Sequence, residues 1–265
     1  MRDKVLIFGG TTEGRVLADI LRRSGIPHEV SVATEYGREI EISSGEDNIL
    51  TGLLSSDEIK ELLLSKEYLL VVDATHPFAV KASSDIKEAC DRARVDYLRL
   101  SRDTSDIVLN DDKILYVDSM DVAAKELDKK EGNILLLTGS KDLSTITAGI
   151  SSLERVFVRV LPSIESIRLC QEAGVEGKHI IAMQGPFSTE MNIALINECG
   201  AKIMLTKESG RSGGYYEKIE AAHKCGIQVI VVRNPEKKDN DEKFLGMKDI
   251  LDMMAKEYHL PVIYD

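Results

Sequence analysis

The sequence contains no tryptophan, and aromatic residues make up only 5% of its 265 residues. Because proteins bind single-stranded nucleic acids by stacking bases on aromatic side chains, this scarcity argues against a stacking platform. A formal net charge of −11 argues against general binding to the phosphate backbone. We therefore expect no nucleic-acid partner, and we expect any anionic ligand to be held by a few local basic residues and backbone amides.

Long apolar runs and metal-binding patterns are also missing. No stretch approaches the roughly 20 apolar residues that a membrane span needs, and charged residues at Arg2–Lys4 lead directly into an apolar run. These features predict a cytoplasmic protein with no signal peptide and no membrane partner. The four cysteines form no Cys-x-x-Cys pair and have no histidine at ligand spacing, so we expect reduced thiols and no metal.

Several signatures of catalysis are absent as well. The chain has neither the Gly-x-Ser-x-Gly elbow of serine hydrolases nor the His-Glu-x-x-His pattern of zinc proteases. Tyr215 and Tyr216 have no lysine four residues later, as the Tyr-x-x-x-Lys pair of short-chain dehydrogenases would require. Hydrolase and metalloenzyme functions therefore have little support.

What the sequence does contain is a regular alternation of apolar and amphipathic segments. Consecutive apolar residues such as Leu69–Val72 indicate strands covered on both faces, as in parallel sheets. The pattern predicts an α/β protein with two Rossmann-like, doubly wound parallel-sheet domains, at residues 1–112 and 113–265, and an interdomain cleft for a ligand. The polar segment Asp103–Met120 suggests the boundary.

The expected strands are Val5–Phe8, Glu29–Ala33, Leu69–Asp73, Tyr97–Leu100, Ile134–Thr138, Arg155–Val160, Ile180–Met183, Lys202–Leu205 and Gln228–Val232. The expected helices are Glu13–Ser24, Ser56–Ser65, Val80–Ala93, Asp121–Lys129, Ser163–Ala173, Thr189–Glu198, Tyr215–Cys225 and Lys248–Lys256. Nearly every unusual polar residue directly follows one of these strands, which is where open α/β sheets bind ligands.

The most informative of these segments is the glycine turn, residues Gly9–Gly14, between the first expected strand and helix. Free amides and the positive end of the helix dipole meet there, and glycine lets a phosphate approach closely. The spacing differs from Gly-x-Gly-x-x-Gly. It matches the outer glycines of a P-loop, but Arg15 stands where the lysine is needed, which disfavours nucleotide hydrolysis. The alternative is a turn needed only for chain reversal.

Two further segments follow strands of the first domain. Thr34, at the end of the second expected strand, lies where dinucleotide folds contact the adenosine ribose. Thr34 and Arg38 would tolerate a 2′-phosphate, whereas Glu35 would oppose it, so the sequence leaves NADH and NADPH open. After the third expected strand, Thr75 or His76 would cap a helix starting near Pro77. The alternative is that Asp73, Thr75 and His76 face a ligand, with His76 able to move protons.

In the second domain, small and basic residues follow several expected strands. The segment Lys207–Gly214 combines three glycines, two serines and two cations ahead of a helix, a composition that suits a polyanion. Leu137–Lys141 resembles another anion-binding turn, and Arg159 lies at a strand end. The basic residues Lys141, Arg159, Lys207 and Arg211 predict a locally positive site in an acidic protein.

Taken in order, these motifs resemble one family, the precorrin-6A reductases, which includes the cobalt-precorrin-6A reductases of the anaerobic cobalamin pathway. The resemblance covers about Lys4 to Pro235. It rests on Gly-Gly-Thr-Thr-Glu-Gly-Arg (9–15), Ala-Thr-Glu-Tyr-Gly (33–37), Asp-Ala-Thr-His-Pro-Phe-Ala (73–79), Thr-Gly-Ser-Lys (138–141), Arg-Val-Leu-Pro (159–162), Gln-Gly-Pro-Phe-Ser (184–188) and Lys-Glu-Ser-Gly-Arg-Ser-Gly-Gly (207–214).

The resemblance implies an oxidoreductase of cobalamin biosynthesis that uses NADPH or NADH. A hydride would pass to a conjugated C=C/C=N system of a tetrapyrrole-derived macrocycle bearing many carboxylates, and protonation would complete the reduction. We expect a monomer or small homo-oligomer. The alternatives are a non-catalytic dinucleotide sensor with two such domains, and an NAD(P)H reductase of a smaller anion.

The site residues that we expect from the motifs and the resemblance fall into three groups. Cofactor contacts are expected from Gly9, Gly10, Thr11, Gly14, Thr34, Lys207, Ser209, Gly213 and Gly214. Substrate contacts are expected from Thr75, His76, Ser140, Lys141, Arg159 and Arg211. Asp73 and His76 are the candidates for a catalytic acid, although water would also be able to deliver the proton.

Overall fold

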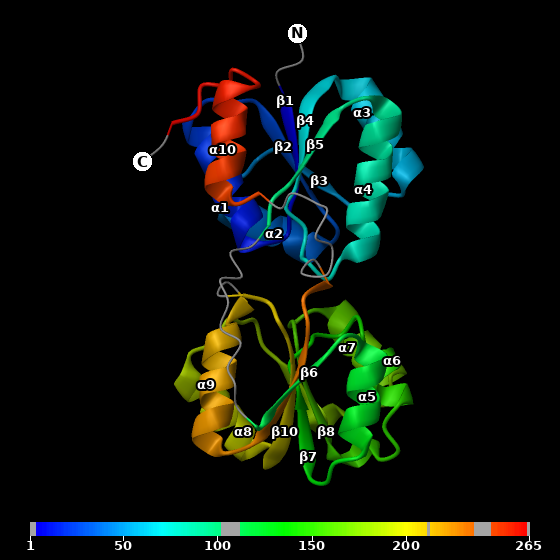
Figure 1. Cartoon of the computed structure of the whole chain (residues 1–265). Helices are drawn as coiled ribbons and strands as arrows, with labels where there is room; N and C mark the ends of the chain where they lie inside the picture. The colour runs from blue at the N-terminus through cyan, green and yellow to red at the C-terminus, as the bar shows by residue number, and fades with distance from the viewer. Residues whose placement is uncertain (1–3, 102–111, 211–212, 236–244, 264–265) are drawn as a thin grey trace. The chain divides into compact units, whose positions relative to one another are not determined.

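The chain is described here from a computed structural model, which covers residues 4–101, 112–210, 213–235 and 245–263. These residues form two compact units (Figure 1). Residues 4–101 and 245–263 make up the first unit, and residues 112–210 with 213–235 make up the second. Each unit is an open parallel sheet covered by helices, so the predicted α/β class with two Rossmann-like domains is confirmed.

The first unit contains a five-stranded parallel sheet in the order β3-β2-β1-β4-β5. Its strands are β1 (Lys4–Phe8), β2 (His28–Val32), β3 (Ile49–Thr51), β4 (Tyr68–Asp73) and β5 (Asp96–Arg99). The central strand β1 pairs with β2 and β4, and Ile7 lies opposite Val30 and Val72. Because both faces of the sheet are covered, its central strands are apolar at consecutive positions.

Apolar side chains alternate between two cores in this unit, one on each face of the sheet. Leu6 and Val71 pack with α3 and α4, while Ile7 and Val72 pack with α1 and α10. The helices are α1 (Thr12–Arg23), α2 (Glu35–Ser43), α3 (Ser56–Lys66), α4 (Val80–Ala93) and α10 (Met247–Lys256). The period-2 alternation along β1 therefore decides which helices each residue contacts.

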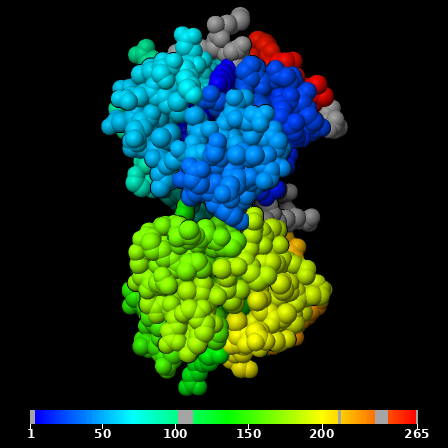
Figure 2. Space-filling model, turned by 180° about the vertical axis from the view of Figure 1, so that it is seen from behind, coloured from blue at the N-terminus to red at the C-terminus, as the bar shows by residue number. Residues whose placement is uncertain are grey.

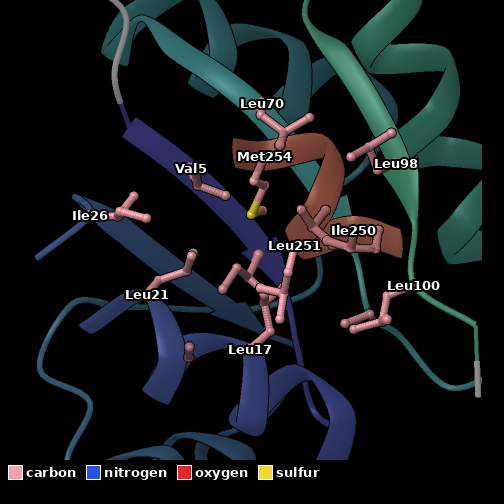
Figure 3. Close-up of a cluster of buried hydrophobic side chains, with 14 of the residues drawn as sticks. Val5, Leu17, Leu21, Ile26, Leu70, Leu98, Leu100, Ile250, Leu251 and Met254 are labelled. Atoms are coloured by element: carbon pink, nitrogen blue, oxygen red, sulfur yellow. The ribbon is translucent and has the colours of Figure 1, made fainter. Parts of the chain in front are cut away.

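Helix α10 lies at the end of the chain but packs on the first sheet. Figure 3 shows Ile250, Leu251 and Met254 directed from α10 toward the sheet and α1. Leu245 also forms a parallel bridge to Leu100, just beyond the end of β5. The expectation that the second domain runs to residue 265 differs from the structure, because this apolar face covers the half of the sheet that α1 leaves open.

This packing predicts a large effect of a single substitution in α10. Met254 is completely buried, so Met254→Ala should lower the free energy of unfolding by about 2–5 kcal/mol through lost burial and a residual cavity. Urea denaturation followed by circular dichroism would measure it. Lys256→Ala, on the exposed side of the same helix, should change stability by less than about 0.5 kcal/mol. Equal effects of the two substitutions would contradict the packing.

The second unit contains a six-stranded parallel sheet in the order β6-β11-β10-β7-β8-β9. Its strands are β6 (Ile114–Val117), β7 (Asn133–Leu136), β8 (Val156–Val160), β9 (Ile180–Ala182), β10 (Ala201–Lys207) and β11 (Gln228–Val232). Its helices are α5 (Met120–Asp128), α6 (Leu143–Ala148), α7 (Ile164–Glu172), α8 (Thr189–Glu198) and α9 (Tyr215–Cys225). Helices α8 and α9 cover one face and α5–α7 cover the other (Figure 1).

Four elements of the fold were not among the sequence expectations. Strand β3 has only two apolar residues, and strand β6 lies within the polar segment taken as the domain boundary. Helix α2 was not expected after Thr34, and α6 spans only six residues. In the reverse view of Figure 2, blue and cyan segments form the visible face of the first unit, and the red C-terminal segment reaches only its margin.

No helix in the described part of the chain is both long and apolar enough to cross a membrane. Within the same residues, no group of three or more histidine, cysteine or acidic side chains is placed to bind a metal ion. The cysteines are unpaired, as expected: Cys90, Cys170 and Cys199 are buried and Cys225 is partly buried. Burial raises the pKa of the Cys90 thiol to about 12, so this thiol stays protonated and unreactive at neutral pH.

Candidate functional site

Each sheet has a point at which the chain reverses the direction in which it adds strands. In the first unit this point lies between β1 and β4, because β2 and β3 extend the sheet on one side and β5 on the other. Ligands of open α/β sheets bind outside the carboxyl ends of the two strands at such a point. The glycine turn follows β1 and the segment Asp73–His76 follows β4, so the fold brings these two sequence motifs together.

The glycine turn is fixed by the side chain of Thr11, which is buried and precedes α1. Its hydroxyl oxygen accepts a hydrogen bond from the Gly14 amide at 3.1 Å and donates one to the Ala74 carbonyl at 2.7 Å. The first bond caps the helix, and the second ties the turn to the chain leaving β4. The Thr11 hydroxyl therefore has a structural role, and the amides of the turn remain as the groups suited to a ligand.

The glycines of this turn serve different purposes. The Gly9 amide donates to the Ser31 carbonyl at 2.8 Å and continues the pairing of β1 with β2. A Cβ atom on Gly14 would lie 3.2 Å from the Cβ of Ala74, which is tighter than ordinary packing. Gly10 has a φ of +95°, and a Cβ atom there would meet nothing within 4 Å. The turn thus combines open space at Gly10 with the first amides of α1, which have no carbonyl partner inside the helix.

Asp73 and Arg99 form a buried ion pair at the end of β4. Asp73 is completely buried, and its Oδ1 atom accepts hydrogen bonds from Arg99 Nη1 at 2.5 Å and the Thr75 amide at 2.9 Å. The Tyr97 hydroxyl donates to Oδ2 at 3.0 Å. Both oxygens of this carboxylate therefore accept hydrogen bonds that hold the end of β4. The geometry does not support the catalytic role that the sequence suggested for Asp73.

The two neighbours of Asp73 also differ from expectation. Neither Thr75 nor His76 caps α4, which begins at Val80 with Ala79 as its N-cap residue and no side-chain cap. The Thr75 hydroxyl accepts a hydrogen bond from Arg99 Nη1 at 3.0 Å and lies 3.2 Å from the Ser83 hydroxyl. His76 is partly exposed, and its Nδ1 atom accepts a hydrogen bond from the Phe78 amide at 3.2 Å. His76 remains the accessible titratable group beside the glycine turn.

Thr34 lies on the same edge of the sheet, at the carboxyl end of β2. Its hydroxyl accepts a hydrogen bond from the Gly37 amide at 3.0 Å and caps α2. Glu35–Arg38 form the first turn of this helix, which was not among the expected helices. A helix N-terminus therefore stands where a dinucleotide fold places the adenosine ribose.

In the second unit, the corresponding point lies between β7 and β10, whose carboxyl ends are adjacent. Lys207 at the end of β10 forms an ion pair with Asp142, in the loop after β7, with 2.6 Å between Nζ and Oδ2. Gly139, in the same loop, has a φ of +80°, and a Cβ atom there would meet nothing within 4 Å. The Thr138 hydroxyl is buried and has no hydrogen-bond partner among the described residues. Open space and an unused hydroxyl thus occur together at this edge.

Arg159 is the strongest anion-binding candidate in this unit. Its guanidinium donates to Asn192 Oδ1 at 3.0 Å and lies 4.7 Å from the centre of the Phe187 ring. No carboxylate pairs with Arg159 among the residues that the structure describes. Burial lowers the pKa of the guanidinium to about 10, so it still carries its charge at neutral pH. A charge held away from water without a carboxylate partner favours an anionic ligand.

The loops after β9 and β10 lie next to each other. A Cβ atom on Gly214 would lie 3.0 Å from the Cβ of Pro186, so only glycine fits this contact without a shift. Gly214 has a φ of +63° and is the N-cap residue of α9. Lys218 donates from Nζ to the Gly213 carbonyl at 2.7 Å and holds the turn from beneath. Pro186 of one sequence motif and Gly214 of another therefore lie in contact.

The expected site residues thus divide between the two units. Those of the first unit gather around the ends of β1, β2 and β4: Gly9, Gly10, Thr11, Gly14, Thr34, Asp73, Thr75 and His76. Those of the second unit follow β7, β8 and β10: Ser140, Lys141, Arg159, Lys207, Ser209, Gly213 and Gly214. Lys141 is exposed and Ser209 is buried. Arg211 lies outside the described residues.

Sequence reasoning missed Arg99, Asp142 and Asn192. Arg99 carried a usable signal, because a buried arginine inside a parallel strand requires an acid on a neighbouring strand, and Asp73 ends the preceding one. Asp142 and Asn192 lie on a loop and a helix whose positions only the fold determines, so their pairing with Lys207 and Arg159 had no sequence signal.

Comparison with known proteins decides the family. The family described as "Precorrin-6x reductase CbiJ/CobK" matches residues 4–255. The chain belongs to this precorrin-6x reductase family. It is 38% identical over 258 residues to the cobalt-precorrin-6A reductase of Methanothermobacter thermautotrophicus, covering 95% of this chain and 83% of the relative. It is 32% identical over 234 residues to the cobalt-precorrin-6A reductase of Priestia megaterium, covering 88% of this chain and 91% of the relative.

A solved structure of a precorrin-6A reductase, CobK, has the same fold. The TM-score is 0.78, and the alignment covers 98% of this chain and 99% of the other at 19% identity. At that identity the match concerns the fold alone. Membership in the precorrin-6x reductase family rests on the sequence comparisons. The two candidate sites at the strand ends rest on the fold, so the two sets of observations are independent.

Proposed function

We propose that this member of the precorrin-6x reductase family uses NADH or NADPH to reduce precorrin-6A, or its cobalt complex, to the dihydro form in cobalamin biosynthesis. The observation that carries the proposal is the glycine turn at the strand reversal of the first unit, which combines open space at Gly10 with the amide end of α1. This arrangement fits the diphosphate of a nicotinamide dinucleotide. When bound, the reduced nicotinamide supplies the hydride for the conjugated system of the macrocycle.

The residues of the first unit would hold that cofactor. The amides of the first turn of α1, beside the open space at Gly10, would receive its diphosphate, and the α2 N-terminus at Thr34 would lie near the adenosine ribose. Glu35 and Arg38 are both exposed near that terminus, one opposing and one favouring a 2′-phosphate. We infer that this first turn of α2 determines the preference between NADH and NADPH.

We propose that the substrate carboxylates bind at the carboxyl edge of the second sheet. Arg159 offers a guanidinium without a carboxylate partner among the described residues, and the exposed Lys141 lies in the loop after β7. Leu161 directly follows β8 and is 45% exposed, and Ile164, the first residue of α7, is 90% exposed. Apolar and cationic side chains thus share one strand end, which suits a macrocycle that is apolar on its faces and carries carboxylates at its rim.

The proton that completes the reduction must come either from a side chain of the protein or from water. With Asp73 fully engaged by Arg99, we propose His76 as the protein's own candidate, because it is partly exposed and follows β4 beside the glycine turn. Hydride delivery to one carbon and proton delivery to the conjugated position together add two hydrogens to the macrocycle. The reaction would consume one reduced dinucleotide for each macrocycle reduced.

The proposed reaction is tested by anaerobic incubation with precorrin-6A and, separately, its cobalt complex, each with NADH and with NADPH. We expect loss of absorbance at 340 nm together with a dihydro product two mass units heavier than the substrate. A dinucleotide sensor would bind the cofactor without oxidising it. A reductase of a smaller anion would bind the cofactor and leave both macrocycles unchanged.

The cofactor site predicts a difference between two glycines with similar backbone requirements. Gly10→Ala and Gly25→Ala both place a Cβ atom at positive φ in open space, with φ of +95° and +67°. Each should destabilise the fold by about 1–2 kcal/mol. Only Gly10→Ala should raise the KM for NADH or NADPH, by about tenfold, because it reorients the amides of the glycine turn. Steady-state kinetics would measure the change, and equal KM values in the two variants would remove the turn from the cofactor site.

A further inference from the structure

Glu41 is a buried acid beneath the glycine turn that no part of the proposed reaction uses. It extends from α2, and the residue is 1% exposed. Its Oε1 atom lies 3.6 Å from the position of a Cβ atom on Gly9 and has no hydrogen-bond partner among the described residues. The Gly10 amide lies close enough to the same carboxyl group to favour its ionised form. A buried carboxyl group with an unused oxygen therefore touches the turn that we assign to the cofactor.

The charges around Glu41 come from three directions. Arg15 on α1 favours the ionised form, and Glu46, in the loop after α2, opposes it. Glu46 is itself paired with His28 on β2, with 2.9 Å between Oε2 and Nε2. Burial is the largest influence and raises the pKa of Glu41 above its ordinary value. The carboxyl group thus gains a proton at a higher pH than an exposed glutamate does.

An anion bound to the glycine turn would, like burial, raise the pKa of Glu41. Negative phosphates near a carboxylate disfavour its ionised form, and this repulsion is weakly screened because the group is buried. By linkage, a ligand that raises the pKa of a group binds more tightly when that group is protonated. The Gly10 amide connects the ligand site to Glu41, because it is part of the glycine turn and lies beside the Glu41 carboxyl group.

We propose that Glu41 is a positioning residue that fixes the glycine turn through the Gly10 amide and couples dinucleotide binding to uptake of a proton. The inference rests on the proposed function, since it takes the turn to receive the diphosphate. The coupling predicts the direction in which affinity for the dinucleotide changes with pH. Affinity is highest below the pKa of Glu41 in the free protein, and it falls as pH rises until Glu41 is ionised in the complex as well.

The test compares the wild type with three variants by fluorescence titration of NADH and, separately, NADPH between pH 5 and 9. Glu41→Gln keeps an acceptor for the Gly10 amide and removes the charge, so its affinity should be independent of pH and about tenfold tighter than the wild type at the alkaline end. Glu39→Gln makes the same change at an exposed position of the same helix and should keep the wild-type profile. Glu41→Ala removes the acceptor too and should weaken binding at every pH.

Steady-state kinetics separates positioning from chemistry. With Glu41→Gln, the KM for the dinucleotide should follow the affinity while kcat changes little. A wild-type pH profile in Glu41→Gln would overturn the inference and leave the proposed function intact. A wild-type protein that binds neither dinucleotide at any pH would overturn both. Glu41→Gln and Glu39→Gln with equal pH profiles would show that the coupling comes from the overall charge of the protein rather than from Glu41.

Discussion

Replacing Asp73 with alanine is expected to lower the free energy of unfolding by about 3–5 kcal/mol. The substitution leaves the Arg99 guanidinium, which is 6% exposed, without its carboxylate in the interior of the first unit. It also removes the acceptor for the Thr75 amide and the Tyr97 hydroxyl. Urea denaturation monitored by circular dichroism would measure the loss.

Two controls separate the buried charge from other effects of the Asp73→Ala change. Asp57→Ala breaks an ion pair to Arg92 in which the side chains are 78% and 38% exposed, so it should cost no more than about 1 kcal/mol. The double variant Asp73→Ala with Arg99→Met removes both buried charges and should recover part of the lost stability. If Asp73→Ala costs no more than Asp57→Ala, the pair does not hold the end of β4.

Replacing Arg159 with methionine is expected to reduce kcat/KM for the macrocycle by about 10- to 100-fold with little loss of stability. Charge-assisted hydrogen bonds to a carboxylate contribute about 1.5–3 kcal/mol, which gives that range. The loss of stability should be limited to about 0.5–1.5 kcal/mol for the hydrogen bond to Asn192, because the partly buried guanidinium has no carboxylate partner among the described residues and removing its charge relieves part of the cost of burying it. Anaerobic kinetics and urea denaturation on the same preparation would separate the two effects.

Arg155 provides the matched control for Arg159. It lies just before the opposite end of β8, where its guanidinium donates to the carbonyl oxygens of Lys130 and Gly132 at 2.6 and 3.0 Å and to that of Leu127 at 3.0 Å. Arg155→Met should therefore lower stability by about 1–3 kcal/mol and leave kcat/KM for the macrocycle unchanged. A loss of activity in Arg155→Met matching that in Arg159→Met would mean that Arg159 acts through the fold and not through the substrate.

The regular parts of this fold could be predicted because the sequence repeats a simple physical pattern. Central strands such as β1 and β4 are covered on both faces and are therefore apolar at consecutive positions, and helices α4, α8 and α9 have the predicted ends. Strand β6 was missed because it lies within the polar segment taken as the domain boundary, and β3 was missed because it has only two apolar residues, Ile49 and Leu50. The place of α10 was missed because its apolar face does not reveal which sheet it covers.

The candidate site could be predicted in its position but not in the state of each side chain. The rule that polar residues after parallel strands share one sheet edge placed the glycine turn beside Asp73–His76. It could not say that Asp73 pairs with Arg99, that Lys207 pairs with Asp142, or that Arg159 has no carboxylate partner in the described part of the chain. These states depend on pairings between residues 26 and 65 positions apart in two cases, which only the folded chain brings together.

The place of α10 also has a consequence for the order in which the chain can mature during synthesis. The first unit is assembled from both ends of the sequence, whereas the described residues of the second unit come from one continuous region between them. When residues 4–101 have left the ribosome, the sheet surface that Ile250 and Met254 will cover is still bare. The second unit can therefore complete its core first, and the sheet of the first unit stays partly uncovered until α10 has been translated.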